Sequence, residues 1–156
     1  SGSDVRYYTT NENGQIDRLI LSDVTGDLWE YAALDGIQAA TRFVATEECD
    51  ASDAYKQAYV NASDEDVIII KSPVGMPGRA IKNAFIEQML AAPDKISHCF
   101  NCLKACNPAT APYCITQALI NAVVGDLDNG LIFCGSRVGE IKKITTVPKL
   151  MQELTV

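Results

Sequence analysis

The stretch Val67-Ile68-Ile69-Ile70 is a continuous run of β-branched apolar residues. Such a run is typical of a strand that is buried on both faces of a sheet. Two more short stretches, at 36–44 and 130–135, combine apolar and small residues and are also predicted to be strands. The long intervals between the three stretches leave room for helices, as in an α/β fold.

Helical patterns fill these intervals. The segments 50–62 and 110–124 repeat apolar residues at helical spacing. Ser52, or Asp50 before it, is a suitable N-cap for the first, and Gly125 is a suitable C-terminal stop for the second. Two shorter helices are predicted at 84–92 and after Pro148. The alternation predicts an α/β core within residues 35–156.

Residues 1–34 have a different pattern. Strand-forming residues at 5–10 and 16–21 flank the turn dipeptide Asn13-Gly14, which predicts a β-hairpin. A short helix is predicted to follow at 28–34. We therefore expect an N-terminal segment with a hairpin extension, followed by the larger α/β part.

Length and charge exclude some classes of protein. The chain has 156 residues, 47% hydrophobic residues and a formal net charge of −7, which are ordinary values for one globular domain. The negative charge argues against a nucleic-acid-binding protein, because the phosphate backbone of a nucleic acid binds basic surfaces. The apolar runs are far too short to span a membrane. No secretory signal pattern is visible, which favours a cytoplasmic location.

Four of the six cysteines are concentrated in one loop, at 98–114. Their spacing is C-x2-C-x3-C-x7-C, and thiolates at such short spacing can converge on one metal centre. We expect Cys99, Cys102, Cys106 and Cys114 to hold a [4Fe–4S] cluster or zinc. Disulfides and unliganded thiols remain alternatives at this point. His98, beside the first cysteine, is either a neighbouring ligand or an exposed loop residue.

Four stretches resemble one known family. They are Asp35–Glu48, Ser72–Asn83, Pro112–Ile115 and Asn129–Gly135. In this order they resemble the C-terminal part of the nitronate monooxygenase family, formerly 2-nitropropane dioxygenase. That family is close to the flavin-dependent enoyl-acyl-carrier-protein reductases. The resemblance implies the C-terminal portion of a (β/α)8 (TIM) barrel flavoprotein that uses FMN, and residues 1–34 do not share it.

The resemblance also implies cofactor-binding residues. The family pattern D-G-x-Q-x-G-T-R-F corresponds to residues 35–43, where Ala40 replaces the second glycine. It implies that the FMN phosphate lies against Gln38, Ala39, Ala40 and Thr41, because small residues let backbone N–H groups approach an anion. The late segment with Gly135 and Ser136 resembles the part of the family that approaches the flavin ring.

Much of the family's machinery has no counterpart in this sequence. A (β/α)8 barrel takes about 250 residues, and the family's catalytic histidine belongs to a motif that His98 does not match. The catalytic residues therefore stay unknown. Two functions remain: a fragment or short relative of an FMN-dependent oxidoreductase acting on a small molecule, or a non-catalytic metal- or cluster-stabilised accessory module. Part of a barrel leaves sheet edges uncovered, so we expect self-association or a partner chain.

Overall fold

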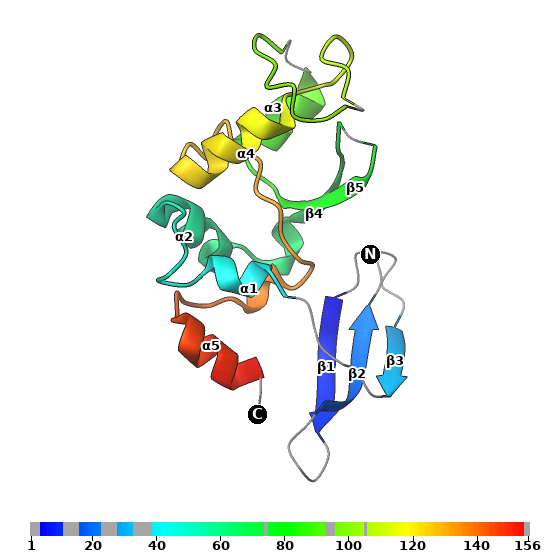
Figure 1. The fold of residues 1–156 in the computed structure, drawn as a ribbon, viewed down its shortest axis with the longest axis vertical. Helices are drawn as coiled ribbons and strands as arrows, with labels where there is room; N and C mark the ends of the chain where they lie inside the picture. Colours follow the sequence, from blue (N-terminus) through cyan, green and yellow to red (C-terminus); the bar gives the residue numbers. More distant parts are fainter. Residues whose placement is uncertain are drawn as a thin grey trace.

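The structure of the protein is a computed structural model that describes residues 4–10, 16–22, 28–32, 39–73, 75–92, 96–104 and 106–154. Figure 1 shows a three-stranded sheet formed by the N-terminal part and a mixed α/β part formed by the rest. The turn Asn13-Gly14 and the candidate cofactor residue Gln38 lie outside the described residues.

The N-terminal sheet has the order β1-β2-β3 and is antiparallel throughout. Its strands are β1 (Asp4–Thr10), β2 (Ile16–Ser22) and β3 (Leu28–Ala32). The pairing of β1 with β2 confirms the hairpin. The helix predicted at 28–34 is wrong, because Leu28–Ala32 pairs with β2 from Ser22 to Arg18. The aromatic residues Trp29 and Tyr31 favour a strand once a partner strand is available.

The second sheet consists of β4 (Val67–Lys71) and β5 (Pro77–Ile81), paired antiparallel. The chain at 131–135 runs beside β5: the Ile81 N–H donates to the Ile132 carbonyl at 2.9 Å and the Cys134 N–H to the Arg79 carbonyl at 3.0 Å. This segment makes one ladder bridge, Ala80 to Phe133. It is therefore an irregular third strand rather than the regular strand predicted at 130–135.

Two expectations about the strands need correction. The strand at 67–70 exists, but Ile70 is buried whereas Ile69 is 61% exposed, so the strand is not covered on both faces. The strand predicted at 36–44 is wrong where the structure describes it, because Thr41–Val44 forms the short helix α1. Both sheets in the described part of the chain are antiparallel, so the α/β class is confirmed while the parallel strands of a barrel are not seen there.

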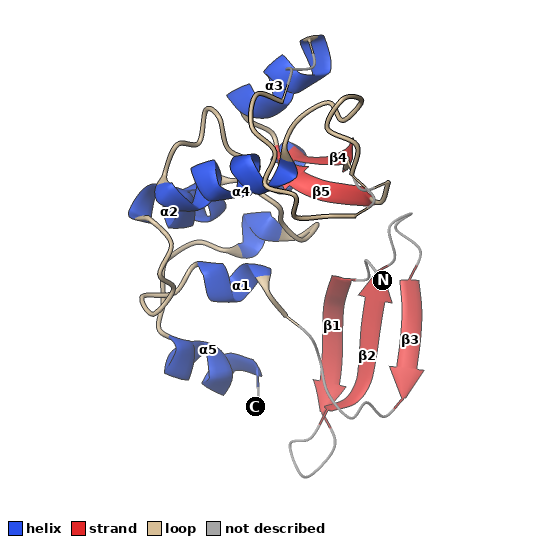
Figure 2. Ribbon diagram, turned by 45° about the horizontal axis from the view of Figure 1, so that its top comes forward, coloured by secondary structure: helices blue, strands red, loops and turns tan. Residues whose placement is uncertain are grey.

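The described part of the chain contains four longer helices, α2 (Asp53–Asn61), α3 (Ala84–Ala91), α4 (Ile115–Val124) and α5 (Val147–Leu154). In Figure 2, α3 and α4 lie beside the second sheet, whereas α5 lies at the opposite end of the α/β part, close to α1. Two single turns of 3-10 helix, Asp64–Asp66 and Val138–Glu140, link other segments.

The helix ends predicted from the sequence are correct in part. The Ser52 hydroxyl accepts a hydrogen bond from the Tyr55 N–H, which confirms that N-cap. Gly125 ends α4 at φ +102°, a conformation that suits glycine. The N-terminus predicted at 110 is wrong, because α4 begins at Ile115 after Cys114 as N-cap. Residues 108–113 form turns before it.

The core consists of two apolar clusters on either side of the segment that follows Gly130. Leu131 packs with Ile70, Ile86 and Tyr113, among others. Ile132 packs with Tyr59 in the other cluster. Successive side chains of an extended chain point in opposite directions, so one short segment supplies both clusters.

The beginning and end of the α/β part lie side by side. Thr46 and Thr145 form a parallel bridge, and an ion pair of 2.5 Å joins Arg42 of α1 to Glu153 of α5. No helix in the described part of the chain has the length and apolar character needed to cross a membrane.

Candidate functional site

Two of the segments assigned to the cofactor by resemblance meet in the structure. The Thr41 hydroxyl accepts a hydrogen bond from the Gly135 N–H at 2.9 Å. Thr41 is the first residue of α1, and Gly135 directly follows the irregular strand beside β5. The bond therefore holds the end of that strand against the start of α1.

The residues beside Thr41 are small and accessible. Ala39 and Ala40 are both exposed, so their backbone can be reached from solvent. Ala40 has φ −127° and ψ −52°, which lies outside the region that favours glycine. Alanine in place of the family's glycine therefore causes no backbone strain here. Ser136 is half-buried next to Gly135.

A close approach between β5 and the irregular strand shapes the same region. A Cβ atom added at Gly78 would lie 2.5 Å from Cε1 of Phe133. No real side chain tolerates that distance, so glycine at 78 is required for the ring of Phe133 to pack across β5. The sequence predicted a strand that contains Phe133 but not its contact with Gly78, because a contact between distant residues is not encoded locally.

A buried tyrosine fixes the backbone of the irregular strand. The Tyr59 hydroxyl lies 2.7 Å from the Phe133 carbonyl oxygen and 2.8 Å from the Tyr55 hydroxyl, and it hydrogen-bonds to both. Tyr59 is 1% exposed, and burial raises the pKa of its hydroxyl. Helical spacing over 50–62 predicted the helix that carries both tyrosines, but their hydrogen bonds could not be inferred from spacing.

The four clustered cysteines line one cavity of about 60 Å³ between the loop and the start of α4. The Cys102 sulfur accepts a hydrogen bond from the Thr116 hydroxyl at 2.9 Å, and the Cys99 sulfur accepts one from the Asn101 N–H at 3.4 Å. Apolar side chains complete the lining, with Ile96, Leu103 and Ile115 among them. The structure thus brings the predicted ligands around a common space.

The structure does not bring them into a metal-binding arrangement. In the part of the chain that is described, no three His, Cys, Asp or Glu side chains are placed so that they could hold a metal ion. All six cysteines are outside disulfides, which removes the disulfide alternative. Cys49 and Cys134, which lie outside the cluster, are half-buried. The predicted convergence of sulfurs on one metal centre is therefore not confirmed.

His98 has a different neighbourhood from the Thr41–Gly135 contact. It is exposed, packs edge-to-face on Phe100 and lines a separate cavity between α3 and α4. Neither Thr41 nor Gly135 lines that cavity.

Comparison with known proteins identifies the class. The family described as nitronate monooxygenase matches residues 31–156. A "Probable nitronate monooxygenase" from Staphylococcus saprophyticus subsp. saprophyticus is 34% identical over 62 residues, 40% of this chain and 18% of that protein. A protein of the same description from Staphylococcus aureus (strain Newman) is 34% identical over 55 residues, 35% of this chain and 16% of that protein.

Solved structures agree with this result. FabK from Thermotoga maritima superposes with a TM-score of 0.57 and 30% identity, covering 72% of this chain and 33% of the FabK chain. A structure of a mutant of the same FabK has the same TM-score with 25% identity and covers 78% of this chain. The matches thus span only about a third of FabK and under a fifth of the curated relatives.

The chain belongs to the nitronate monooxygenase family, since the family match extends over most of its length. The resemblance that the sequence suggested is confirmed. The match begins at residue 31, close to the expected boundary at residue 35.

Proposed function

We propose that this chain is the C-terminal part of an FMN-dependent oxidoreductase and contributes to its cofactor-phosphate site. The observation that carries the proposal is the hydrogen bond between the Gly135 N–H and the Thr41 hydroxyl. It joins the two segments that family resemblance assigns to the flavin, although they lie 94 positions apart. Membership of the nitronate monooxygenase family supports FMN as the cofactor.

The residues at this contact fit a phosphate group. Ala39 and Ala40 are small and exposed, so a phosphate oxygen can approach their backbone closely. Thr41 adds a hydroxyl that can donate to the phosphate, because it accepts rather than donates in its bond to Gly135. We further propose that Gly135 and Ser136 lie toward the flavin ring.

In this proposal the cofactor and the residues of the chain have different roles. Bound FMN would supply the electron-transfer chemistry, as flavins do. The residues of this chain would hold and orient the phosphate. The catalytic base and the remaining barrel strands would come from the part of the relatives that this chain does not match.

A titration of the chain with FMN, followed residue by residue by NMR, tests this proposal. We expect the amide signals of Ala39, Ala40, Thr41, Gly135 and Ser136 to move on adding FMN. Riboflavin, which lacks the phosphate, is the matched control and should leave the first three unmoved. Shifts confined to other segments, or equal shifts with riboflavin, would contradict the phosphate assignment.

A second candidate function is that of a metal- or cluster-stabilised module. The observation in its favour is that Cys99, Cys102, Cys106 and Cys114 line one cavity. In addition, none of the described residues from 96 to 111 is buried, so the apolar core does not anchor this loop. Thiolates closing on zinc or an iron–sulfur cluster would anchor it.

Metal analysis and a visible spectrum of anaerobically purified protein test this second candidate. About one zinc or four iron atoms per chain, reduced by Cys102→Ser but not by Cys134→Ser, would support it. Removing the metal should then loosen residues 95–114 before the core. Protein without stoichiometric metal after anaerobic reconstitution would refute it.

We also propose that the exposed apolar side chains are covered in the assembled protein. Four large apolar side chains are each more than half exposed: Ile69, Met76, Leu90 and Val124. Contact of apolar surface with water is unfavourable in free energy, which favours a partner that covers them. Sedimentation at increasing concentration should show self-association. A strictly monomeric protein at high concentration would count against a second copy as the cover.

A further inference from the structure

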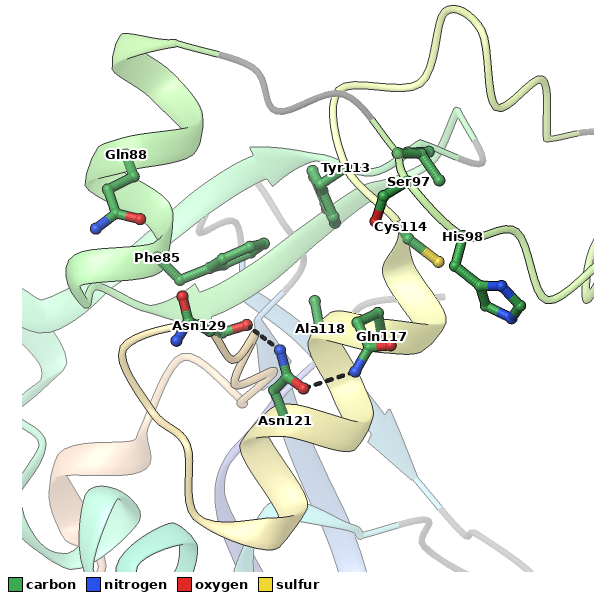
Figure 3. A pocket seen from close by; sticks show the side chains of 11 residues that line it. Phe85, Gln88, Ser97, His98, Tyr113, Cys114, Gln117, Ala118, Asn121 and Asn129 are labelled. Atoms are coloured by element: carbon green, nitrogen blue, oxygen red, sulfur yellow. Dashed lines mark hydrogen bonds between the residues drawn. The ribbon is translucent and has the colours of Figure 1, made fainter.

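A second cavity lies between α3, α4 and residues 96–98, and the proposed flavin site does not use it (Figure 3). Its volume is about 190 Å³. An engineered cavity of about 150 Å³ is known to bind benzene, so this space accommodates one ring with small substituents. It is partly open to solvent, which gives a ligand access.

The lining is polar and includes carboxamides and the imidazole of His98. Carboxamides enter it from three segments: Gln88 on α3, Gln117 and Asn121 on α4, and Asn129 after α4. Among the described residues that line it there is no Asp, Glu, Lys or Arg. A charged ligand would lose hydration there without a carboxylate, ammonium or guanidinium group in return, so we infer that the cavity favours a neutral ligand.

One wall of the cavity is aromatic. The rings of Phe85 and Tyr113 meet edge-to-face, with centroids 5.3 Å apart and planes at 90°. Tyr113 is 4% exposed, so this wall is held firmly by the core. A flat ring of the ligand can pack against it while its polar edge faces the carboxamides.

Hydrogen bonds fix the direction of the carboxamides. The Gln117 Nε2 donates to the Asn121 Oδ1 at 2.7 Å, and the Asn121 Nδ2 donates to the Asn129 carbonyl at 3.0 Å. Figure 3 shows this chain of contacts along one side of α4. Asn121 is thereby occupied at both ends, whereas Gln117 keeps its Oε1 and its second N–H for another partner.

A free oxygen and a free N–H on one planar amide form a matched acceptor and donor. Their complement is a cis-amide edge, with a carbonyl next to an N–H in a ring. Asparagine and glutamine read the edges of nucleobases in this bidentate way. We propose that the cavity binds a small, neutral, single-ring heterocycle with such an amide edge, that Gln117 recognises the edge, and that Phe85 and Tyr113 pack against the ring.

Uracil and 2-pyridone, which both have such an amide edge, are the test ligands. Their binding to the chain is measured by saturation-transfer NMR and by titration. For ligands of about eight non-hydrogen atoms we expect saturable binding with a dissociation constant on the order of 1 mM or tighter. 1,3-Dimethyluracil, which has no N–H to donate, and orotate, which adds a carboxylate, should each bind at least about ten-fold more weakly.

Gln117→Met keeps the length of the side chain and removes both amide groups. It should weaken uracil binding roughly ten-fold, whereas Gln57→Met, at an exposed position on α2, should leave binding unchanged. No saturable binding of either probe up to about 10 mM would overturn the proposal. Equal binding of uracil and its dimethyl derivative, or of wild type and Gln117→Met, would overturn the amide recognition. Flavin binding tested separately with FMN distinguishes this result from failure of the proposed function.

Discussion

The Thr41 hydroxyl accepts a hydrogen bond of 2.9 Å from the backbone N–H of Gly135. Gly135 directly follows the irregular strand beside β5, and Thr41 is the first residue of α1, so the bond connects the end of that strand to the start of the helix. The bond is partly buried, so its loss leaves an N–H with limited access to water.

Thr41→Val should therefore destabilise the protein by about 1–2 kcal/mol, because valine keeps the shape of threonine but cannot accept a hydrogen bond. We also expect weaker FMN binding. Thr41→Ser, which retains the hydroxyl, should lose less than half as much stability in urea denaturation. Equal losses in the two variants would show that packing of the methyl group, not the hydrogen bond, is what matters.

Tyr59→Phe should cost about 1–3 kcal/mol of unfolding free energy, since it leaves the buried Phe133 carbonyl without its hydroxyl donor. Tyr55→Phe is the matched control. It removes the outer hydroxyl of the same pair but keeps the bond to Phe133, and it should cost less. Chemical denaturation of both variants ranks the two bonds, and the opposite ranking would contradict this account.

Tyr113→Phe should behave in the opposite way. The Tyr113 hydroxyl is buried and has no hydrogen-bond partner among the described residues, so its removal should leave stability at pH 7 unchanged or slightly higher. A loss above about 1 kcal/mol would reveal a partner for this hydroxyl.

The same residue should make stability depend on alkaline pH. Burial raises the pKa of Tyr113 to about 12, above the value of about 10 for an unfolded chain. The unfolded state therefore releases its proton first, and the unfolding free energy should fall by roughly 1–3 kcal/mol between pH 10 and 12. Tyr113→Phe should lose less stability over this interval, which denaturation at several pH values can measure.

Gly78→Ala should destabilise the protein by about 1–3 kcal/mol, because the new methyl group would overlap the ring of Phe133. Phe133→Leu removes the overlapping ring atoms, so the double variant should recover part of the stability that Gly78→Ala loses. A double-mutant cycle gives the coupling between the two positions. Additive losses would mean that the ring moves aside at no cost.

Local sequence signals were sufficient where a structure depends on neighbours in the chain. Ser52 and Gly125 marked the ends of α2 and α4 correctly, because capping requires particular residue types at particular positions. The hairpin of β1 and β2 was also found from its turn and flanking strands. Family resemblance then indicated that Thr41 and Gly135 belong to one site, and the structure places them in contact.

Signals failed where distant contacts decide the outcome. Leu28–Ala32 was predicted as a helix and is a strand, because pairing with β2 determines its conformation. Thr41–Val44 contains strand-forming residues but forms the short helix α1. The cysteine spacing gave the right group of residues around one cavity but not a metal-binding arrangement, since spacing does not fix the loop in space.

The bridge between Thr46 and Thr145 has a consequence for biosynthesis. Ribosomes deliver a chain from its N-terminus, so α1 and α2 emerge long before the residues that pair with them. Leu150, fully buried in α5, is made long after them. The nascent chain must keep one side of its core open until α5 has been made, and it is exposed to chaperones and proteases throughout that interval.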